Sequence, residues 1–169
     1  EGEPRGRVVL IHGIGEHSGR YRHVAAAFVA AGYAVRAYDQ RGHGRSGGWR
    51  GHVDGFRQYL CDLDQVIWDL GAADAGPLVL FGHSMGGLIT LRYLQTRWET
   101  PLAGAVISNP CLEFVEQPSA LKLLGCRVLN CVVPRLGLGN DLDATRICRD
   151  PQVVADYQAD PLVHGKISA

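Results

Sequence analysis

The sequence has no excess of charge of either sign. Its 169 residues include 17 Lys and Arg against 17 Asp and Glu. Proteins that bind nucleic acid or an anionic membrane surface by charge carry a clear basic excess, so the balance gives no support for such binding. We therefore expect no nucleic-acid partner.

Disulfide and zinc-binding patterns are also missing. The cysteines are odd in number and form no C-x-x-C pair: they are Cys61, Cys111, Cys126, Cys131 and Cys148. This usage favours a reducing compartment, and hence a cytoplasmic protein, over a disulfide-stapled secreted domain or a zinc site.

Long apolar runs are absent too. No stretch approaches the roughly eighteen apolar residues of a membrane span, and no basic-then-apolar signal segment opens the chain, so we expect no transmembrane segment. The length allows one domain with a real core. Because the chain begins at Glu1 rather than Met, we expect it to be cut from something longer.

What the sequence does contain is an alternation of strand-like and helix-like patterns. Short apolar runs predict buried strands at 7–11, 33–38, 77–81 and 102–107. Periodic apolar residues between these runs predict helices; Gly32 is placed to end the first, and Asp54 is available to cap the second. Strand, helix and strand at this spacing predict a parallel sheet covered on both faces.

The third strand runs into Gly82-His83-Ser84-Met85-Gly86-Gly87, which places one serine at a sharp strand-to-helix corner. This pattern is typical of a nucleophile elbow, with a chance turn as the alternative. Gly82 and Gly86 give the strained backbone room on either side of Ser84. The helix that follows directs its free N–H groups at whatever binds there, so Ser84 is the candidate nucleophile.

Two other loops should reach the same place. His12-Gly13 and Asp39 each follow a predicted strand, as Ser84 does. Sites in open parallel sheets form at the carboxyl ends of the strands, so these three loops are expected to converge on one crevice.

Three motifs make the chain recognisable: His12-Gly13-Ile14-Gly15-Glu16-His17-Ser18-Gly19-Arg20-Tyr21, Tyr38-Asp39-Gln40-Arg41-Gly42-His43-Gly44-Arg45-Ser46 and Gly82-His83-Ser84-Met85-Gly86-Gly87. In order and spacing they resemble the monoacylglycerol lipase and lysophospholipase group of the α/β-hydrolase fold. The resemblance is strongest over 8–110 and returns at Asp160-Pro161-Leu162. It implies a mostly parallel, doubly wound sheet with an apolar cap, and a serine hydrolase of monoacyl lipid esters.

The alternation ends at Pro110, which divides the chain into two predicted parts. Residues 1–110 are the N-terminal part of an α/β-hydrolase core with the elbow, and 111–169 are a cap or lid region with an incomplete C-terminal core. The first half of the second part is apolar but broken by Pro118 and Pro134, which predicts short helices. We interpret these helices as a mobile lid over the crevice, with ordinary core packing as the alternative. Such a lid is also the candidate for transient contact with a membrane surface.

Ester cleavage by a serine requires N–H donors for the charge that develops on the carbonyl oxygen. Met85 N–H, in the first turn after the nucleophile, is one candidate, and the resemblance implies Ile14 N–H as the other. Glu16 and Arg20 follow this loop; they either contact the polar head of a lipid ester substrate or form a solvated ion pair. Such a mechanism needs no metal and no organic cofactor.

The histidines near these motifs are predicted to have supporting roles. His12 buttresses the oxyanion loop, His83 packs against neighbouring loops, and His43 braces the glycine-rich loop with Asp39. A catalytic dyad of Asp39 and His43 serving Ser84 is the alternative, but in α/β-hydrolases the acid and the base follow the nucleophile in the chain.

No strand followed by Asp and then His is apparent after Pro110. The one histidine beyond Ser84 is His164, in a polar tail. We therefore expect a truncated sequence whose triad acid and histidine lie downstream. A complete chain of this kind would be nearly inactive, which leaves a non-catalytic binding protein of the same fold as the alternative. A third hypothesis for the function is a short-chain esterase or a peptidase of the same fold.

Overall fold

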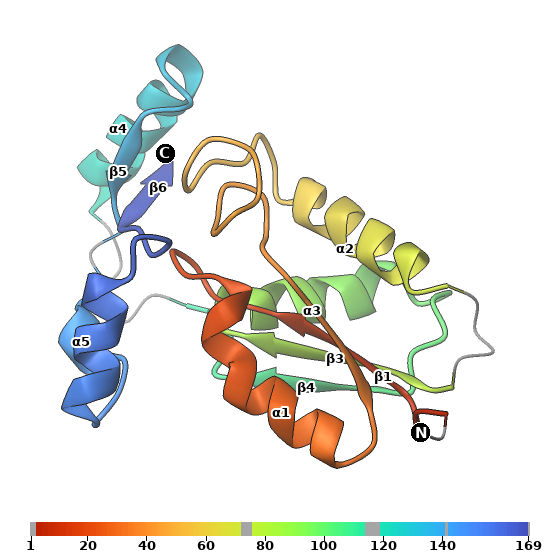
Figure 1. Ribbon diagram of the computed structural model, residues 1–169. Helices are drawn as coiled ribbons and strands as arrows, with labels where there is room; N and C mark the ends of the chain where they lie inside the picture. Colours follow the sequence, from red (N-terminus) through yellow and green to blue (C-terminus); the bar gives the residue numbers. More distant parts are fainter. Residues whose placement is uncertain (1–2, 72–75, 114–118, 141, 169) are drawn as a thin grey trace.

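A four-stranded parallel sheet forms the centre of the molecule (Figure 1). The computed structural model describes residues 3–71, 76–113, 119–140 and 142–168. The strands have the order β2-β1-β3-β4; they are β1 Arg7–Ile11, β2 Ala34–Tyr38, β3 Leu78–His83 and β4 Gly104–Ser108. All pairs are parallel, as the alternating sequence pattern predicts.

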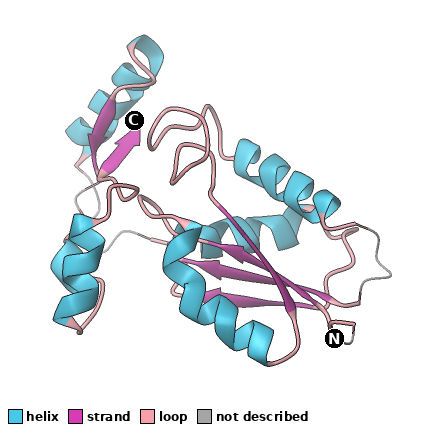
Figure 2. Ribbon diagram, viewed as in Figure 1, coloured by secondary structure: helices cyan, strands magenta, loops and turns pink. Residues whose placement is uncertain are grey.

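Helices cover both faces of this sheet (Figure 2). They are α1 Arg22–Ala30, α2 Arg57–Asp69 and α3 Met85–Thr96. Side chains alternate across a strand, so Val9 of β1 packs in one core with Leu63 of α2 and Ile89 of α3. On the other face, the ring of Phe81 lies 6.1 Å from that of Phe28 on α1. The prediction of a doubly covered parallel sheet is confirmed.

The sequence predicts the end of α1 correctly but not the residue that caps the start of α2. Gly32, with φ +86°, follows the last turn of α1 as expected. Asp54 does not cap α2, whose N-cap residue is Phe56 without a side-chain hydrogen bond. The carboxylate of Asp54 instead accepts from Gln58 Nε2 at 3.2 Å, because the chain turns into the helix two residues later than the sequence pattern indicates.

Beyond β4 the chain forms α4 Ala120–Val132, β5 Gly137–Gly139, α5 Pro151–Ala159 and β6 Lys166–Ser168. β5 and β6 pair antiparallel as a second, separate sheet. Neither strand was predicted from the sequence; each is three residues long and gains its partner only through a distant segment. In the described part of 111–143, one helix of 13 residues stands where several short ones were expected.

These later elements lie at the carboxyl ends of the parallel strands (Figure 1). His164 N–H donates to the Gly15 carbonyl at 2.8 Å, and Ser168 N–H donates to the Gly51 carbonyl at 3.0 Å. His17 Nε2 lies 2.7 Å from Asp160 Oδ2 at the end of α5. Residues 160–168 are thus tied by backbone and side-chain bonds to the loops that follow β1 and β2.

Neither a span nor a disulfide is found in the described residues. None of the helices there combines the length and the apolar content that crossing a bilayer requires. All five cysteines lie within the described ranges and have free thiols.

Candidate active site

The candidate nucleophile occupies the turn between β3 and α3. Ser84 has φ 52° and ψ −116°, a conformation that costs free energy for any residue with a side chain. Its N–H donates to the Ser108 carbonyl at 3.0 Å, and its carbonyl accepts from Leu88 N–H at 3.0 Å and Cys111 N–H at 3.1 Å. The surrounding backbone therefore holds the strained turn in place.

The glycines of the elbow are required by close packing. A Cβ atom at Gly82 would strike the carbonyl of Gly86 and the hydroxyl of Thr90. One at Gly86 would strike the carbonyl of Ile11, at the end of β1. The first turn of α3 thus lies directly against the neighbouring strand, which a side chain would prevent.

Ser84 opens into a cavity of about 500 Å³. Gly13 and Ile14 form part of its wall, and a Cβ atom at Gly13 would lie 3.2 Å from that of Ser84. Residues from beyond β4 close another side: Leu142, Arg146, Ile147 and Tyr157. The nucleophile therefore lies between the loop after β1 and the segment that includes α5.

The two predicted oxyanion donors are the backbone N–H groups of Met85 and Ile14. Met85 is the first residue of α3, where N–H groups have no partner within the helix. Within the described part of the chain, neither Met85 N–H nor Ile14 N–H donates to a protein acceptor. This availability is what an oxyanion hole requires.

Glu16 and Arg20 both line the cavity and form an ion pair, with Arg20 Nε 3.0 Å from Glu16 Oε2. Glu16 Oε1 also accepts from Gly13 N–H at 2.7 Å and from the Tyr21 hydroxyl at 2.5 Å. Burial, followed by the negative charge of Glu16, raises the pKa of Tyr21 far above its usual value, so the hydroxyl stays a donor. Both oxygens of Glu16 are occupied by this local network.

Two histidines predicted to support the site lie close to it. The side chain of His12 is buried, and its Nε2 accepts from Gln40 N–H at 2.9 Å. His83 lines the cavity, with Nδ1 3.1 Å from the hydroxyl of Ser108. Desolvation by burial lowers the pKa of His12, so the ring is neutral at pH 7.

Asp39 and His43 both hold loops, and no bond between them is found among the described residues. Asp39 accepts from Ser18 N–H and from Arg45 N–H, each at 2.8 Å. His43 is buried with Nδ1 2.9 Å from the Arg41 carbonyl. Neither residue lines the cavity that holds Ser84, so the expected convergence of three loops applies to those of Gly13 and Ser84 rather than to Asp39.

His164 also makes its hydrogen bonds with groups other than Ser84. Its Nδ1 accepts from Lys166 N–H at 3.3 Å, which leaves Nε2–H to donate to the Gly42 carbonyl at 3.1 Å. The ring lies 4.9 Å from that of His43. All seven histidines are in the described part of the chain, and none of them forms a hydrogen bond with the hydroxyl of Ser84.

Several residues of the site were not predicted from the sequence. Gln40 and Tyr21 belong to its hydrogen-bond network, and Tyr157 reaches the cavity with its ring under the guanidinium of Arg20 at 4.4 Å. No local signal marks Tyr157, because α5 returns to the site only in the folded chain.

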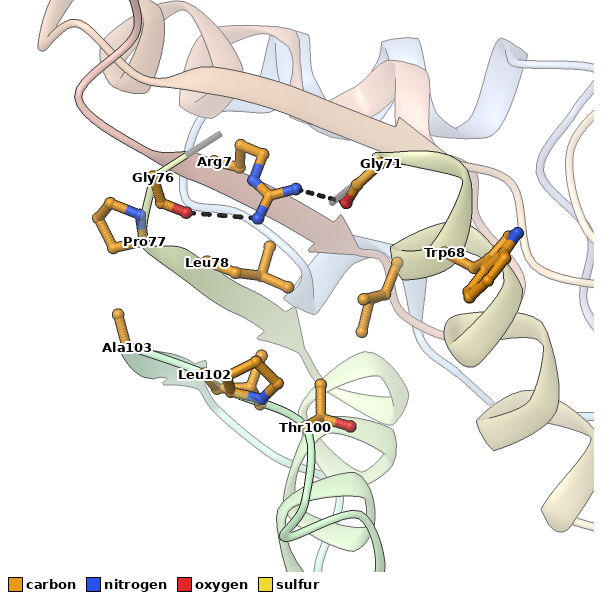
Figure 3. Close-up of a pocket in the computed structure, with 11 residues that line it drawn as sticks. Arg7, Trp68, Gly71, Gly76, Pro77, Leu78, Thr100, Leu102 and Ala103 are labelled. Atoms are coloured by element: carbon orange, nitrogen blue, oxygen red, sulfur yellow. Dashed lines mark hydrogen bonds between the residues drawn. The ribbon is translucent and has the colours of Figure 1, made fainter. Parts of the chain in front are cut away.

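A larger cavity, of about 810 Å³, lies at the opposite ends of the strands (Figure 3). Arg7 on its wall donates to the carbonyls of Gly71 and Gly76 at 3.1 and 3.3 Å. A cation that binds carbonyls after the last turn of α2 stabilises that helix end. This cavity includes no part of the elbow, and parallel sheets place their sites at the other end.

A parallel sheet with a strained serine at a strand-to-helix turn, open to a cavity at the carboxyl ends of the strands, defines an α/β-hydrolase. The family model described as serine aminopeptidase, S33 (Hydrolase_4) matches residues 2–169. The chain belongs to this family of hydrolases.

Its relatives include lipases. A monoacylglycerol lipase of Mycolicibacterium smegmatis is 42% identical over 99% of this chain and 60% of the relative, and the human monoglyceride lipase is 37% identical over 96% and 54%. Among solved structures, a monoacylglycerol lipase of Paleococcus ferrophilus superposes with a TM-score of 0.87 at 40% identity, over 99% of this chain and 63% of that one. The chain thus spans less than two thirds of the length of these relatives.

We expect Gly86→Ala to destabilise the protein, because the new Cβ atom meets the Ile11 carbonyl and the start of α3 must move. Overpacking of this kind costs about 1–3 kcal/mol in the free energy of unfolding. Gly104→Ala is the matched control, since no atom lies within 4 Å of a Cβ there. Urea unfolding measures both; equal stability of the two variants would contradict the packing argument.

Acid should destabilise the folded chain partly through His43. Burial lowers its pKa from 6.5 to about 4. Between these values the unfolded chain binds a proton that the folded chain does not, so stability falls as the pH drops from 6.5 to about 4. The slope from this one group is at most about 1.4 kcal/mol per pH unit. Urea unfolding at several pH values should show a shallower slope for His43→Asn; an unchanged slope would refute the assignment.

Proposed function

We propose that the protein is a serine hydrolase that cleaves carboxylic esters of monoacyl lipids. The observation that carries this proposal is Ser84 in a strained elbow, open to a cavity and near two N–H groups that have no acceptor among the described residues. The family and the names of the relatives support the same chemistry.

In the proposed reaction the Ser84 hydroxyl attacks the ester carbonyl and loses its proton to a histidine base. The N–H groups of Ile14 and Met85 stabilise the negative charge that develops on the carbonyl oxygen. Loss of one such donor typically raises the barrier by about 2.7–4 kcal/mol. The alcohol leaves, and water then hydrolyses the acyl-enzyme to release the fatty acid.

The histidine base and its acid partner are assigned to a part of the protein outside these 169 residues. The reason is that the histidines of this chain are not bonded to Ser84, and both ring nitrogens of His164, the one histidine that follows Ser84, are in use. His12, Gly13, Gly82, His83 and Gly86 have supporting roles in this proposal.

The cavity suits a substrate with an apolar chain and a small polar head. Val24, Phe81 and Ile147 contribute apolar wall, whereas Glu16 and Arg20 are the candidates for contact with the head group. The family description names an aminopeptidase, but relatives named as lipases at 37–42% identity favour an ester over a peptide.

The segment 111–169 acts as a cap in this proposal, and α4 is its contact with a lipid surface. Leu121, Leu124, Val128 and Val132 fall at helical spacing and are 80%, 58%, 54% and 72% exposed. An exposed apolar stripe of this kind is typical of a helix that lies in a membrane interface. In this proposal the protein is cytoplasmic, which its free cysteines favour, and it attaches to membranes peripherally and transiently.

The native gene product should form one covalent adduct with a fluorophosphonate, seen as a mass increase in the intact-mass spectrum. Ser84→Ala should abolish this adduct, whereas Ser168→Ala should retain it. The same preparation should hydrolyse long-chain monoacylglycerol. A wild type without an adduct would favour a non-catalytic binding protein, and fast turnover of acetyl esters alone would favour a short-chain esterase.

Binding to lipid vesicles should depend on the stripe of α4. Leu121→Glu places a charge on the proposed contact and is expected to reduce cosedimentation with phosphatidylcholine vesicles several-fold. Trp98→Glu is the control, because Trp98 is 79% exposed but lies after α3. Equal cosedimentation of the two variants and the wild type would rule out this surface.

A further inference from the structure

We infer that Gln40 is a positioning residue of this site: acting through His12, it orients the peptide that carries the Ile14 N–H donor. The inference rests on the proposed function, because it assigns a residue to the oxyanion hole. Gln40 follows β2 and is 1% exposed, and it does not line the cavity.

The ring proton of His12 is on Nδ1. The backbone N–H of Gln40 lies 2.9 Å from His12 Nε2. A backbone N–H can only donate, so Nε2 has no proton and the single proton of the neutral ring is on Nδ1. The backbone N–H of Gln40 thus selects one tautomer of His12, and the side chain of Gln40 acts on the peptide that follows that ring.

This tautomer of His12 donates a hydrogen bond to the peptide that carries the Ile14 N–H. His12 Nδ1 lies 2.7 Å from the carbonyl oxygen of Gly13, and with the proton on Nδ1 the ring donates to that oxygen. The Gly13 carbonyl and the Ile14 N–H belong to the same planar peptide and point in opposite directions. Fixing the carbonyl toward His12 therefore fixes the direction of the Ile14 N–H.

The side chain of Gln40 holds the preceding peptide. Its Nε2 donates to the His12 carbonyl at 2.6 Å, while the Gly13 N–H at the other end of that peptide donates to Glu16 Oε1 at 2.7 Å. Gly13 itself has no side chain to restrict it. Two consecutive peptides before Ile14 are thus held by Gln40, His12 and Glu16 rather than by the loop alone.

Loss of the Gln40 side-chain amide leaves the backbone N–H and the tautomer of His12 in place but releases the His12 carbonyl. It should therefore affect the transition state more than the bound substrate. Misplacement of a donor acts on the charge that appears during attack, so kcat falls while KM changes little. Removal of a whole oxyanion donor costs about 10²–10³-fold in kcat, so partial misplacement should cost about tenfold or more.

The test uses the full-length gene product with a long-chain monoacylglycerol. Gln40→Met keeps the length of the side chain but removes the amide. Gln40→Glu keeps the shape and places an acceptor where the amide nitrogen lies 3.3 Å from His12 Nδ1, so that it competes for the ring proton. Gln58→Met is the matched control, because Gln58 is on α2 and bonds to Asp54.

Rates are expressed per serine labelled by fluorophosphonate at completion, so that unfolded protein is not counted. We expect both Gln40 variants to lose about tenfold or more in kcat at unchanged KM, and Gln58→Met to match the wild type. Wild-type kcat in both Gln40 variants would overturn the inference, and so would a rise in KM alone. A wild type that neither labels nor turns over would instead refute the proposed function.

Discussion

The contact between the first turn of α3 and the end of β1 is the constraint on which the rest of the site depends. Gly86 lies against the Ile11 carbonyl so closely that a Cβ atom would not fit. This approach forces the strained backbone of Ser84 and brings the serine beside Gly13. Ser84 N–H donates to the Ser108 carbonyl, and Cys111 N–H donates to the Ser84 carbonyl. These bonds offset the strain, so β4 and the chain after it stabilise the turn as well.

A second layer of buried polar groups holds the loops around this contact. His12 and His43 are fully buried, and their rings lie 5.5 Å apart; His164 continues the row against His43. Burial lowers the pKa of all three, so the rings are neutral near pH 7 and can each donate and accept one hydrogen bond. Loops from three distant segments are thereby joined without a buried charge.

Much of the fold follows from local pattern. The four parallel strands are short apolar runs, and the elbow is marked by glycines on both sides of Ser84, as the contacts of Gly82 and Gly86 explain. The pairing of β5 with β6 had no such signal, because strands of three residues carry too little alternation to be recognised. The approach of Tyr157 and Leu142 to the cavity also had no sequence signal, because their positions depend on where α5 and its neighbours pack.

The parallel sheet, the elbow and the candidate nucleophile could be predicted before folding is considered, since each depends on residues that are neighbours in the chain or on a simple period. The roles of the remaining polar residues depend on contacts that exist only in the folded chain. Glu16 and Arg20 are joined to Gly13 and Tyr21, and Gln40 fixes the tautomer of His12. A hydrogen bond depends on distance and direction between groups, and these arise only when strands distant in sequence are brought side by side.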